Sequence, residues 1–208
     1  MVDVDEDVPQ LSADTFTALA QFYAEQEERE KEWDGENAGS EIKEDWQLSQ
    51  FWYSSETGES LARMVMAAAG EKGSVACISA PTLYKHIKMI NKDYNVKVFE
   101  YDKRFSCYGE DFIFYDYKAP LSIPRELVEN FDIVFADPPF LSDECLTKTA
   151  VTMKYVGKGR MVLCSGAIMA DMADRLLNLK LCKFQPQHQN NLANQFQCFA
   201  NFDFDAFD

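Results

Sequence analysis

Hydrophobic residues follow two different spacings along this chain, and the alternation between them predicts an α/β fold. Short apolar runs predict five buried strands, over 75–79, 96–100, 112–116, 131–137 and 160–165. Apolar residues three and four apart predict helices after residue 53, from Pro81, over 143–156 and over 168–179. The stretches 181–184 and 195–201 predict an antiparallel strand pair at the end of the chain.

Three of the helices carry apolar residues at defined positions. In the helix after residue 53, which Gly70 ends, the inward residues are expected to be Leu61, Met64, Val65 and Ala68. The helix from Pro81 carries Leu83, Ile87 and Ile90. In the helix over 168–179, we expect the inward residues to be Met169, Met172, Leu176 and Leu179.

Strands that alternate with helices form a parallel sheet that is covered on both faces. The closing strand pair then predicts an open, doubly wound sheet with one antiparallel strand inserted near an edge. Ligands of such sheets bind beyond the carboxyl ends of the strands. The residues directly after each strand are therefore the candidates for chemistry.

The acidic residues are concentrated at the start of the chain. Residues 1–45 hold 15 acids and 3 bases, whereas residues 46–208 hold 20 acids and 17 bases. We expect an acidic tail and helix over 1–40, with the helix starting near Ser12, and a globular domain over 41–208. The arm is either a solvated helix or a docking element for a basic partner.

Composition limits the class of protein. The chain has 208 residues, of which 47% are hydrophobic, and no apolar run approaches the ~20 residues of a membrane span. Six cysteines without a CxxC pair, beside only two histidines, indicate reduced thiols and no metal site. With an acidic rather than basic start, these features predict a cytoplasmic protein without a membrane partner, which we expect to be a monomer.

The charge balance also bears on the kind of partner. Nucleic-acid binders gain much of their affinity from cations that face phosphates, and here the domain is near neutral while the arm is acidic. Nucleic acid is therefore not expected as a partner. A basic patch remains an alternative to a solvated surface for Lys85, Lys88, Lys92 and Lys97.

The first three predicted strands end in residues that could hold a small molecule. Ser79, Ala80, Pro81 and Thr82 form a turn without the glycines of a dinucleotide site, and either a helix N-terminus that meets a ligand or a plain turn is consistent with it. Glu100, followed by Tyr101, could accept hydrogen bonds from ribose hydroxyls or be an ordinary exposed acid. Asp116 and Tyr117 could hold the edge and face of an adenine.

The fourth strand ends in the most specific motif of the chain, Asp137, Pro138, Pro139 and Phe140. Two prolines stiffen the turn and remove two backbone donors. The Asp137 carboxylate and the Pro138 carbonyl can both accept hydrogen bonds from one amino group, and Phe140 offers a face for a ring or an alkyl-ammonium group. Such a turn suits methyl transfer to nitrogen.

These motifs resemble a known family. The (Asp/Asn)-Pro-Pro-aromatic turn is similar to that of class I S-adenosylmethionine-dependent amino methyltransferases. The chain more closely resembles the eukaryotic lysine methyltransferases of translation elongation factor 1-alpha, once labelled adenine-specific DNA methyltransferases, in residues 45–53, 79–84, 100–105, 108–112, 136–141 and 191–194. The resemblance runs from about Trp46 to the C-terminus.

The resemblance implies a seven-stranded, Rossmann-like sheet that binds S-adenosylmethionine as methyl donor, and elongation factor 1-alpha as protein substrate. Ala80 and Pro81 would lie along the methionine part of the donor, Glu100 at its ribose, and Asp116 with Tyr117 at its adenine. Phe51, Trp52 and Tyr53 would fold over the site as donor-binding residues, although each ring could equally pack in the core.

The residue chemistry leaves some roles open. A lysine amine must be neutral to attack the donor methyl, so we assign Asp137 to orienting that amine, with general base as a second interpretation. His188 lies in a polar loop between the last two strands that could line the acceptor entrance, and it is expected at the surface rather than in catalysis. Two alternatives to lysine methylation remain: adenine methylation in DNA or RNA, and a non-catalytic binding module with the same fold.

Overall fold

The computed structural model describes residues 17, 21, 42–190 and 195–208. The chain divides into two compact units, Met1–Ile42 and Lys43–Asp208. In the first unit Thr17 and Gln21 are helical and exposed, and most of the predicted acidic helix and linker lies outside the described residues. The expected division after residue 40 therefore stays a prediction.

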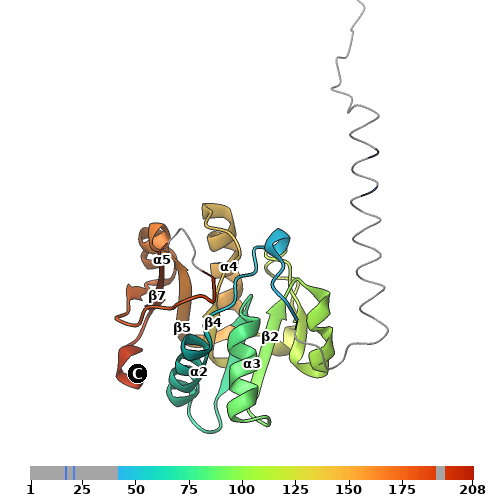
Figure 1. The fold of residues 1–208 in the computed structure, drawn as a ribbon. Helices are drawn as coiled ribbons and strands as arrows, with labels where there is room; N and C mark the ends of the chain where they lie inside the picture. Colours follow the sequence, from blue (N-terminus) through green and yellow to red (C-terminus); the bar gives the residue numbers. More distant parts are fainter. Residues whose placement is uncertain (1–16, 18–20, 22–41, 191–194) are drawn as a thin grey trace, which may run out of the picture. The chain divides into compact units, whose positions relative to one another are not determined.

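Seven strands form one sheet in the order β3-β2-β1-β4-β5-β7-β6 (Figure 1). Adjacent strands from β3 to β5 are parallel, and β7 is antiparallel to both β5 and β6. This confirms the predicted doubly wound sheet with a C-terminal antiparallel strand. The strands span Ser74–Ile78 (β1), Asn95–Glu100 (β2), Phe112–Phe114 (β3), Phe131–Ala136 (β4), Gly157–Gly166 (β5), Lys180–Leu181 (β6) and Phe196–Ala200 (β7).

Two pairs of helices cover the two faces of the sheet (Figure 1). Helices α2 (Ser55–Ala69) and α3 (Pro81–Ile90) pack on one face, and α4 (Asp143–Val156) and α5 (Ala170–Leu177) pack on the other. Strand β1 illustrates the arrangement, because all of its residues are buried. Val75 and Cys77 join the cluster under α2 and α3, whereas Ala76 and Ile78 join the cluster under α4 and α5.

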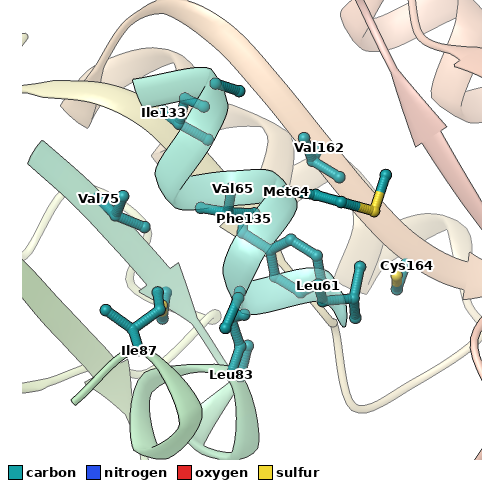
Figure 2. Packing of buried hydrophobic residues seen from close by; sticks show 14 of the residues in the cluster. Leu61, Met64, Val65, Val75, Leu83, Ile87, Ile133, Phe135, Val162 and Cys164 are labelled. Carbon is teal, nitrogen blue, oxygen red and sulfur yellow. The ribbon is translucent and has the colours of Figure 1, made fainter. Parts of the chain in front are cut away.

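The predicted inward face of α2 is confirmed (Figure 2). Leu61, Met64 and Val65 lie against strand residues that include Val75, Ile133, Phe135 and Val162. Ser54 starts the helix by accepting a hydrogen bond from the Thr57 N–H at 3.2 Å. Gly70, at φ +87°, follows its last turn.

The other helices differ from their predicted ranges mainly at their ends. Pro81 opens α3 as predicted, but Ile90 is its last residue and is 39% exposed. The predicted helix over 168–179 starts as the 3-10 turn Ala167–Met169 and ends early, because Asn178 is left-handed at φ +53°. Met169 and Leu179 are buried, and Met172 and Leu176 pack half-buried against the same cluster.

Strands and helices do not alternate throughout. The 3-10 turns over Lys103–Asp111 connect β2 to β3, and only the 3-10 turn Arg125–Leu127 lies between β3 and β4. Before α2, residues 43–54 form a segment that we call the strap, which contains the 3-10 turn Trp46–Leu48. A last 3-10 turn, Asp205–Phe207, ends the chain.

Candidate active site

A cavity of about 580 Å³ lies at the carboxyl ends of the parallel strands. Such a volume is typical of small-molecule sites. Its wall is built from strap residues 47–53, the segments that follow β1 to β4, and two residues near the C-terminus, His188 and Phe196. All of the residues predicted for donor binding and catalysis line this cavity, namely Phe51, Trp52, Tyr53, Ser79, Ala80, Pro81, Thr82, Glu100, Tyr101, Asp116, Tyr117, Asp137, Pro138, Pro139 and Phe140.

The turn after β1 contains a left-handed backbone conformation although it has no glycine. Ser79 has a left-handed backbone at φ +51°, which is uncommon for a residue with a side chain. Its N–H still donates to the Phe99 carbonyl at 2.8 Å. Pro81 then starts α3 with no side-chain cap, and the first helix residues, Pro81 and Thr82, line the cavity.

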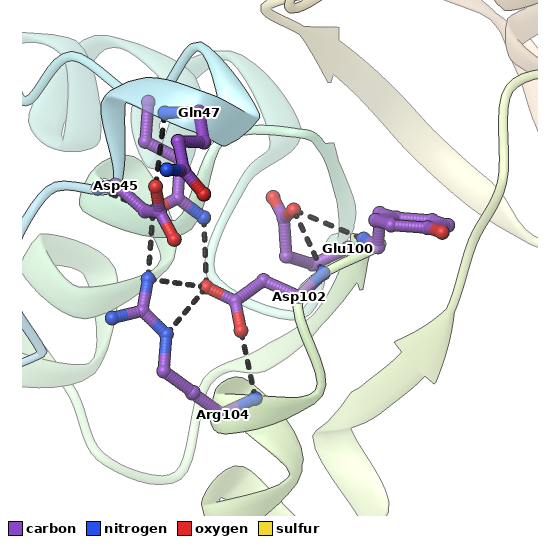
Figure 3. Close-up of polar contacts among 7 residues, drawn as sticks. Asp45, Gln47, Glu100, Asp102 and Arg104 are labelled. Atoms are coloured by element: carbon purple, nitrogen blue, oxygen red, sulfur yellow. Dashed lines mark hydrogen bonds and ion pairs between the residues drawn. The ribbon is translucent and has the colours of Figure 1, made fainter. Parts of the chain in front are cut away.

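Glu100, at the end of β2, is held by its own loop (Figure 3). One carboxylate oxygen, Oε1, accepts hydrogen bonds from the N–H groups of Tyr101 at 2.9 Å and Asp102 at 3.3 Å. Burial raises the pKa of Glu100 to about 7, while the two backbone N–H groups oppose the rise and the charges of Asp102 and Asp137 add to it. Oε2 takes part in neither bond.

The segment after β3 places its two predicted residues in the cavity wall. Asp116 uses Oδ1 to accept the Lys118 N–H at 2.8 Å, which shapes its own turn. The ring of Tyr117 meets that of Phe140 edge-on, with centroids 5.9 Å apart. Phe140 is 43% exposed, so it lies at the boundary between cavity and solvent.

Asp137 lies directly beyond the ladder that joins β4 to β1. Its N–H donates to the Ile78 carbonyl at 3.0 Å, and its Oδ2 accepts the hydroxyl of Tyr53 at 2.5 Å. Burial raises the pKa of Asp137 to about 7, and the hydrogen bond from Tyr53 opposes that rise. The carboxyl group therefore titrates near neutral pH.

Tyr53 lies on the strap, where the strap pairs with the loop around His188. It pairs with His188 in an isolated antiparallel bridge, which is flanked by bonds of 2.8 Å from Ser54 N–H to the Gln187 carbonyl and from Gln189 N–H to the Trp52 carbonyl. Tyr53 is 1% exposed, whereas Phe51 and Trp52 are half-buried. Tyr53 is thus both a packed core residue and part of the cavity wall.

His188 lines the cavity, so its loop borders the site as the sequence allowed. Its ring is half-buried, tilted against that of Tyr53 at 5.0 Å and edge-on to that of Phe196 at 4.8 Å. Burial lowers the pKa of His188, and the charge of Glu44 opposes this. The position of the loop, between the last two strands and at the carboxyl edge of the sheet, is the signal that indicated a place beside the site.

A buried polar network, which the sequence did not predict, anchors the strap (Figure 3). Gln50 donates from Nε2 to Asp102 Oδ2 at 2.9 Å, and its Oε1 accepts from Arg104 Nη2 at 2.9 Å. Arg104 also donates from Nε to Asp102 Oδ2 at 2.8 Å, and the Asp45 N–H donates to Gln50 Oε1 at 3.0 Å. The strap is thereby tied to the loop that carries Glu100. The other lining residues without a predicted role are Gln47, Leu48, Ser49, Tyr115, Lys118, Leu141 and Phe196.

The charges around the cavity favour a cationic or neutral ligand over a polyanion. Within the described part of the chain, its lining holds three carboxyl groups, from Glu100, Asp116 and Asp137, and a single lysine, Lys118. The basic patch is not supported either, because Lys88 and Lys97 both pair with Asp111, at 2.8 and 3.1 Å.

Metal-ligating and membrane-spanning features are both missing from the residues that the structure describes. These residues contain no cluster of three or more His, Cys, Asp or Glu that could hold a metal ion. Over the same residues, every helix is too short or too polar to cross a membrane. The six cysteines are free thiols, and Cys107 alone among them is exposed.

Comparisons with known proteins show which family the chain resembles over nearly its whole length. A family model described as "Probable N6-adenine methyltransferase" matches residues 44–204. EEF1A lysine methyltransferase 1 of Gallus gallus is 53% identical over 208 residues, covering 97% of this chain and 98% of that protein. The Homo sapiens protein of the same name is 51% identical, with coverage of 96% and 94%.

A solved structure extends the comparison to the fold. The branched-chain polyamine synthase from Thermus thermophilus superimposes with a TM-score of 0.58 at 15% identity, covering 83% of this chain and 62% of that one. At that identity the likeness concerns the fold alone.

The motif over 191–194, which contributed to the resemblance found in the sequence, lies outside the described residues.

Proposed function

The chain belongs to the family of the EEF1A lysine methyltransferase 1 proteins, and we propose that it transfers a methyl group from S-adenosylmethionine to a lysine of translation elongation factor 1-alpha. The observation that carries this function is the position of Asp137, Pro138, Pro139 and Phe140 in the wall of the same cavity as Glu100 and the uncapped start of α3. A turn that could hold an amine thus shares one cavity with residues that could hold the donor.

The donor side of the cavity fits the methyl donor in its chemistry. The buried Glu100 keeps one carboxylate oxygen outside its own loop bonds, which suits ribose hydroxyls. Asp116 and the ring of Tyr117 suit an adenine, and the backbone at Ser79, Ala80, Pro81 and Thr82 suits the methionine part. Phe51 and Trp52 would cover the donor from the strap.

The acceptor side suits a lysine side chain. The donor supplies an electrophilic methyl on a positively charged sulfur, and the amine lone pair takes that methyl while the C–S electron pair stays with sulfur. Asp137 and the Pro138 carbonyl would accept the two N–H groups of a neutral amine and direct its lone pair. Phe140 would contact the alkyl chain. A free lysine has a pKa near 10.4, so roughly 0.1% of it is neutral at pH 7.4, and burial in the cavity would raise that fraction.

Adenine methylation is the second candidate, since the matching family model is described by that activity. The same turn can accept the amino group of adenine. The charges argue against a polynucleotide, because three carboxyl groups and one lysine line the described cavity wall. A polynucleotide enzyme needs cations where the phosphates run.

In the test, the purified protein is incubated with methyl-labelled S-adenosylmethionine and with one of three acceptors: elongation factor 1-alpha, genomic DNA or total RNA. Donor binding is measured in parallel. Label on the protein acceptor, lost in Asp137→Ala, is the expected result. Label on nucleic acid alone would reject the lysine assignment. Absence of transfer with absence of donor binding would instead support the binding-module alternative.

We also propose that the protein acts as a cytoplasmic monomer. The six cysteines are free in the structure, which is typical of a reducing compartment. Light scattering of the purified protein would give its mass in solution, and fluorescence of a tagged chain in cells would give its location. A dimer mass or an organellar signal would correct these two points.

A further inference from the structure

We propose that Tyr53 is a positioning residue for methyl transfer, which holds one oxygen of Asp137 so that only the other can receive the acceptor amine. This assignment rests on the proposed function. It also changes the role expected for Tyr53, from covering the donor to orienting the acceptor carboxylate.

The hydroxyl of Tyr53 is held rigidly where it meets Asp137. Its ring is buried at 1% exposure and lies against the His188 ring, and its backbone is paired in the bridge to His188. The O–O distance of 2.5 Å is that of a hydrogen bond from a hydroxyl to a charged carboxylate. A packed donor at this distance fixes both the direction and the rotation of the carboxylate plane.

The two oxygens of the Asp137 carboxylate have different partners. Oδ2 is engaged by Tyr53, so Oδ1 is the oxygen left for a substrate. Oδ1, which has no hydrogen-bond partner among the described residues, and the Pro138 carbonyl then define one orientation for the two N–H groups of an amine. Without the hydroxyl, the carboxylate plane could turn about the Cβ–Cγ bond, and the amine would lose its alignment with the donor methyl.

The hydrogen bond also favours the ionised form of Asp137. The titratable groups around the pair come from every neighbouring element: Glu100 at the end of β2, the Cys164 thiol on β5, which borders the Tyr53 hydroxyl, and His188 after β6. On the β3 side, Asp116 and Lys118 line the same cavity. Burial and the negative charge of Asp137 raise the pKa of Tyr53, so the proton stays on the phenol and Tyr53 stays the donor.

The decisive variant is Tyr53→Phe, which removes the hydroxyl and keeps the ring. Tyr84→Phe is the matched control, because Tyr84 is also buried and donates to a carboxylate, Asp111 Oδ2 at 3.0 Å, but lies outside the cavity lining. Both variants are checked by thermal unfolding. For each, kcat against pH is measured on elongation factor 1-alpha, and donor affinity is measured by calorimetry.

We expect Tyr53→Phe to lower kcat by about tenfold and to move the acidic limb of the pH profile upward by about one unit. Loss of a hydrogen bond to the charged form raises the pKa of Asp137, so a higher pH is needed for ionisation. Donor affinity should stay close to that of the wild type, and Tyr84→Phe should change neither kcat nor the pH profile. In an Asp137→Asn background, Tyr53→Phe should add no further loss.

An unshifted profile with wild-type kcat would overturn the proposal. So would a loss confined to donor affinity, which would return Tyr53 to donor binding. A measurement independent of activity and of the variant's folding is the carboxyl ¹³C signal of Asp137 in the wild-type protein, assigned with Asp137→Asn. This signal should show a deuterium isotope shift from the shared hydrogen bond, and its absence would equally overturn the proposal. If the wild type fails to methylate elongation factor 1-alpha, the proposed function fails, while the isotope shift still tests the bond.

Discussion

Glu100 and Asp137 are two carboxyl groups at the ends of β2 and β4, the strands on either side of β1. Burial raises the pKa of both to about 7. Their partners differ. Glu100 is held by the N–H groups of the next two residues, whereas Asp137 is held by Tyr53, which lies 84 positions away in the sequence.

The difference separates a locally built group from one that depends on the assembled fold. The hydrogen bonds to the Glu100 carboxylate come from its own loop. The geometry of Asp137 also needs the strap and the loop around His188 to dock. We therefore expect donor binding and methyl transfer to respond to different substitutions.

Asp137→Ala should give the largest difference between the loss of kcat and the loss of donor affinity. Loss of the orienting carboxylate should reduce kcat by about a thousandfold, since it acts on the reacting amine itself. Donor affinity, measured by calorimetry with S-adenosylhomocysteine, should change little because Glu100 and the β1 turn remain. Equal losses in kcat and donor affinity would contradict the division between the two carboxyl groups.

A second prediction concerns stability against pH. Glu100 binds its proton more tightly in the folded state, at a pKa of about 7, than in the unfolded state, at about 4.5, so its contribution to stability is lost as pH rises from about 4.5 through 7. Glu100→Gln, which stays neutral, should abolish this part of the decline and gain about 2 kcal/mol over the wild type between pH 5 and pH 8. Urea unfolding at both pH values measures it. If the free energy of unfolding fell equally with pH in the wild type and in Glu100→Gln, burial of Glu100 would not be the cause of the fall.

The same variant, Glu100→Gln, should also weaken binding of the methyl donor. Glu100→Gln keeps an acceptor oxygen but loses the charge, and we expect donor affinity to fall by about tenfold. At saturating donor, kcat should be close to that of the wild type, opposite to the Asp137 result. A lowered kcat at saturating donor, with donor affinity intact, would reverse the roles of the two groups.

The smallest effect should come from loosening the strap at its anchor. Gln50→Leu removes the bonds to Asp102, Arg104 and the Asp45 N–H, and it should lower the free energy of unfolding by about 1 kcal/mol or more. Because Tyr53 lies on the same strap as Phe51 and Trp52, kcat and donor affinity should both fall. Glu59→Ala, which breaks an exposed pair with Arg63 on α2, is the control and should leave both unchanged. A loss of donor affinity alone would mean that the anchor supports only the Glu100 side.

By itself, the sequence determined the elements and the strand-end chemistry. Periodicity reports whether a residue is buried next to its near neighbours, so the five parallel strands, the face of α2 and the closing antiparallel pair could be predicted. The carboxyl ends of parallel strands meet at one edge of a sheet. The order of residues along the chain was therefore enough to place Glu100, Asp116 and Asp137 at one site.

Tertiary structure decided which side chains complete the site. The bond from Tyr53 to Asp137, the network of Gln50, Asp102 and Arg104, and the packing of His188 join segments far apart in the sequence. No local pattern encodes such contacts, because they depend on how the strap and the last loop dock across the strand ends. Ser79 is similar at a smaller scale: its left-handed backbone is imposed by the turn from β1 into α3, where a sequence pattern would have called for glycine.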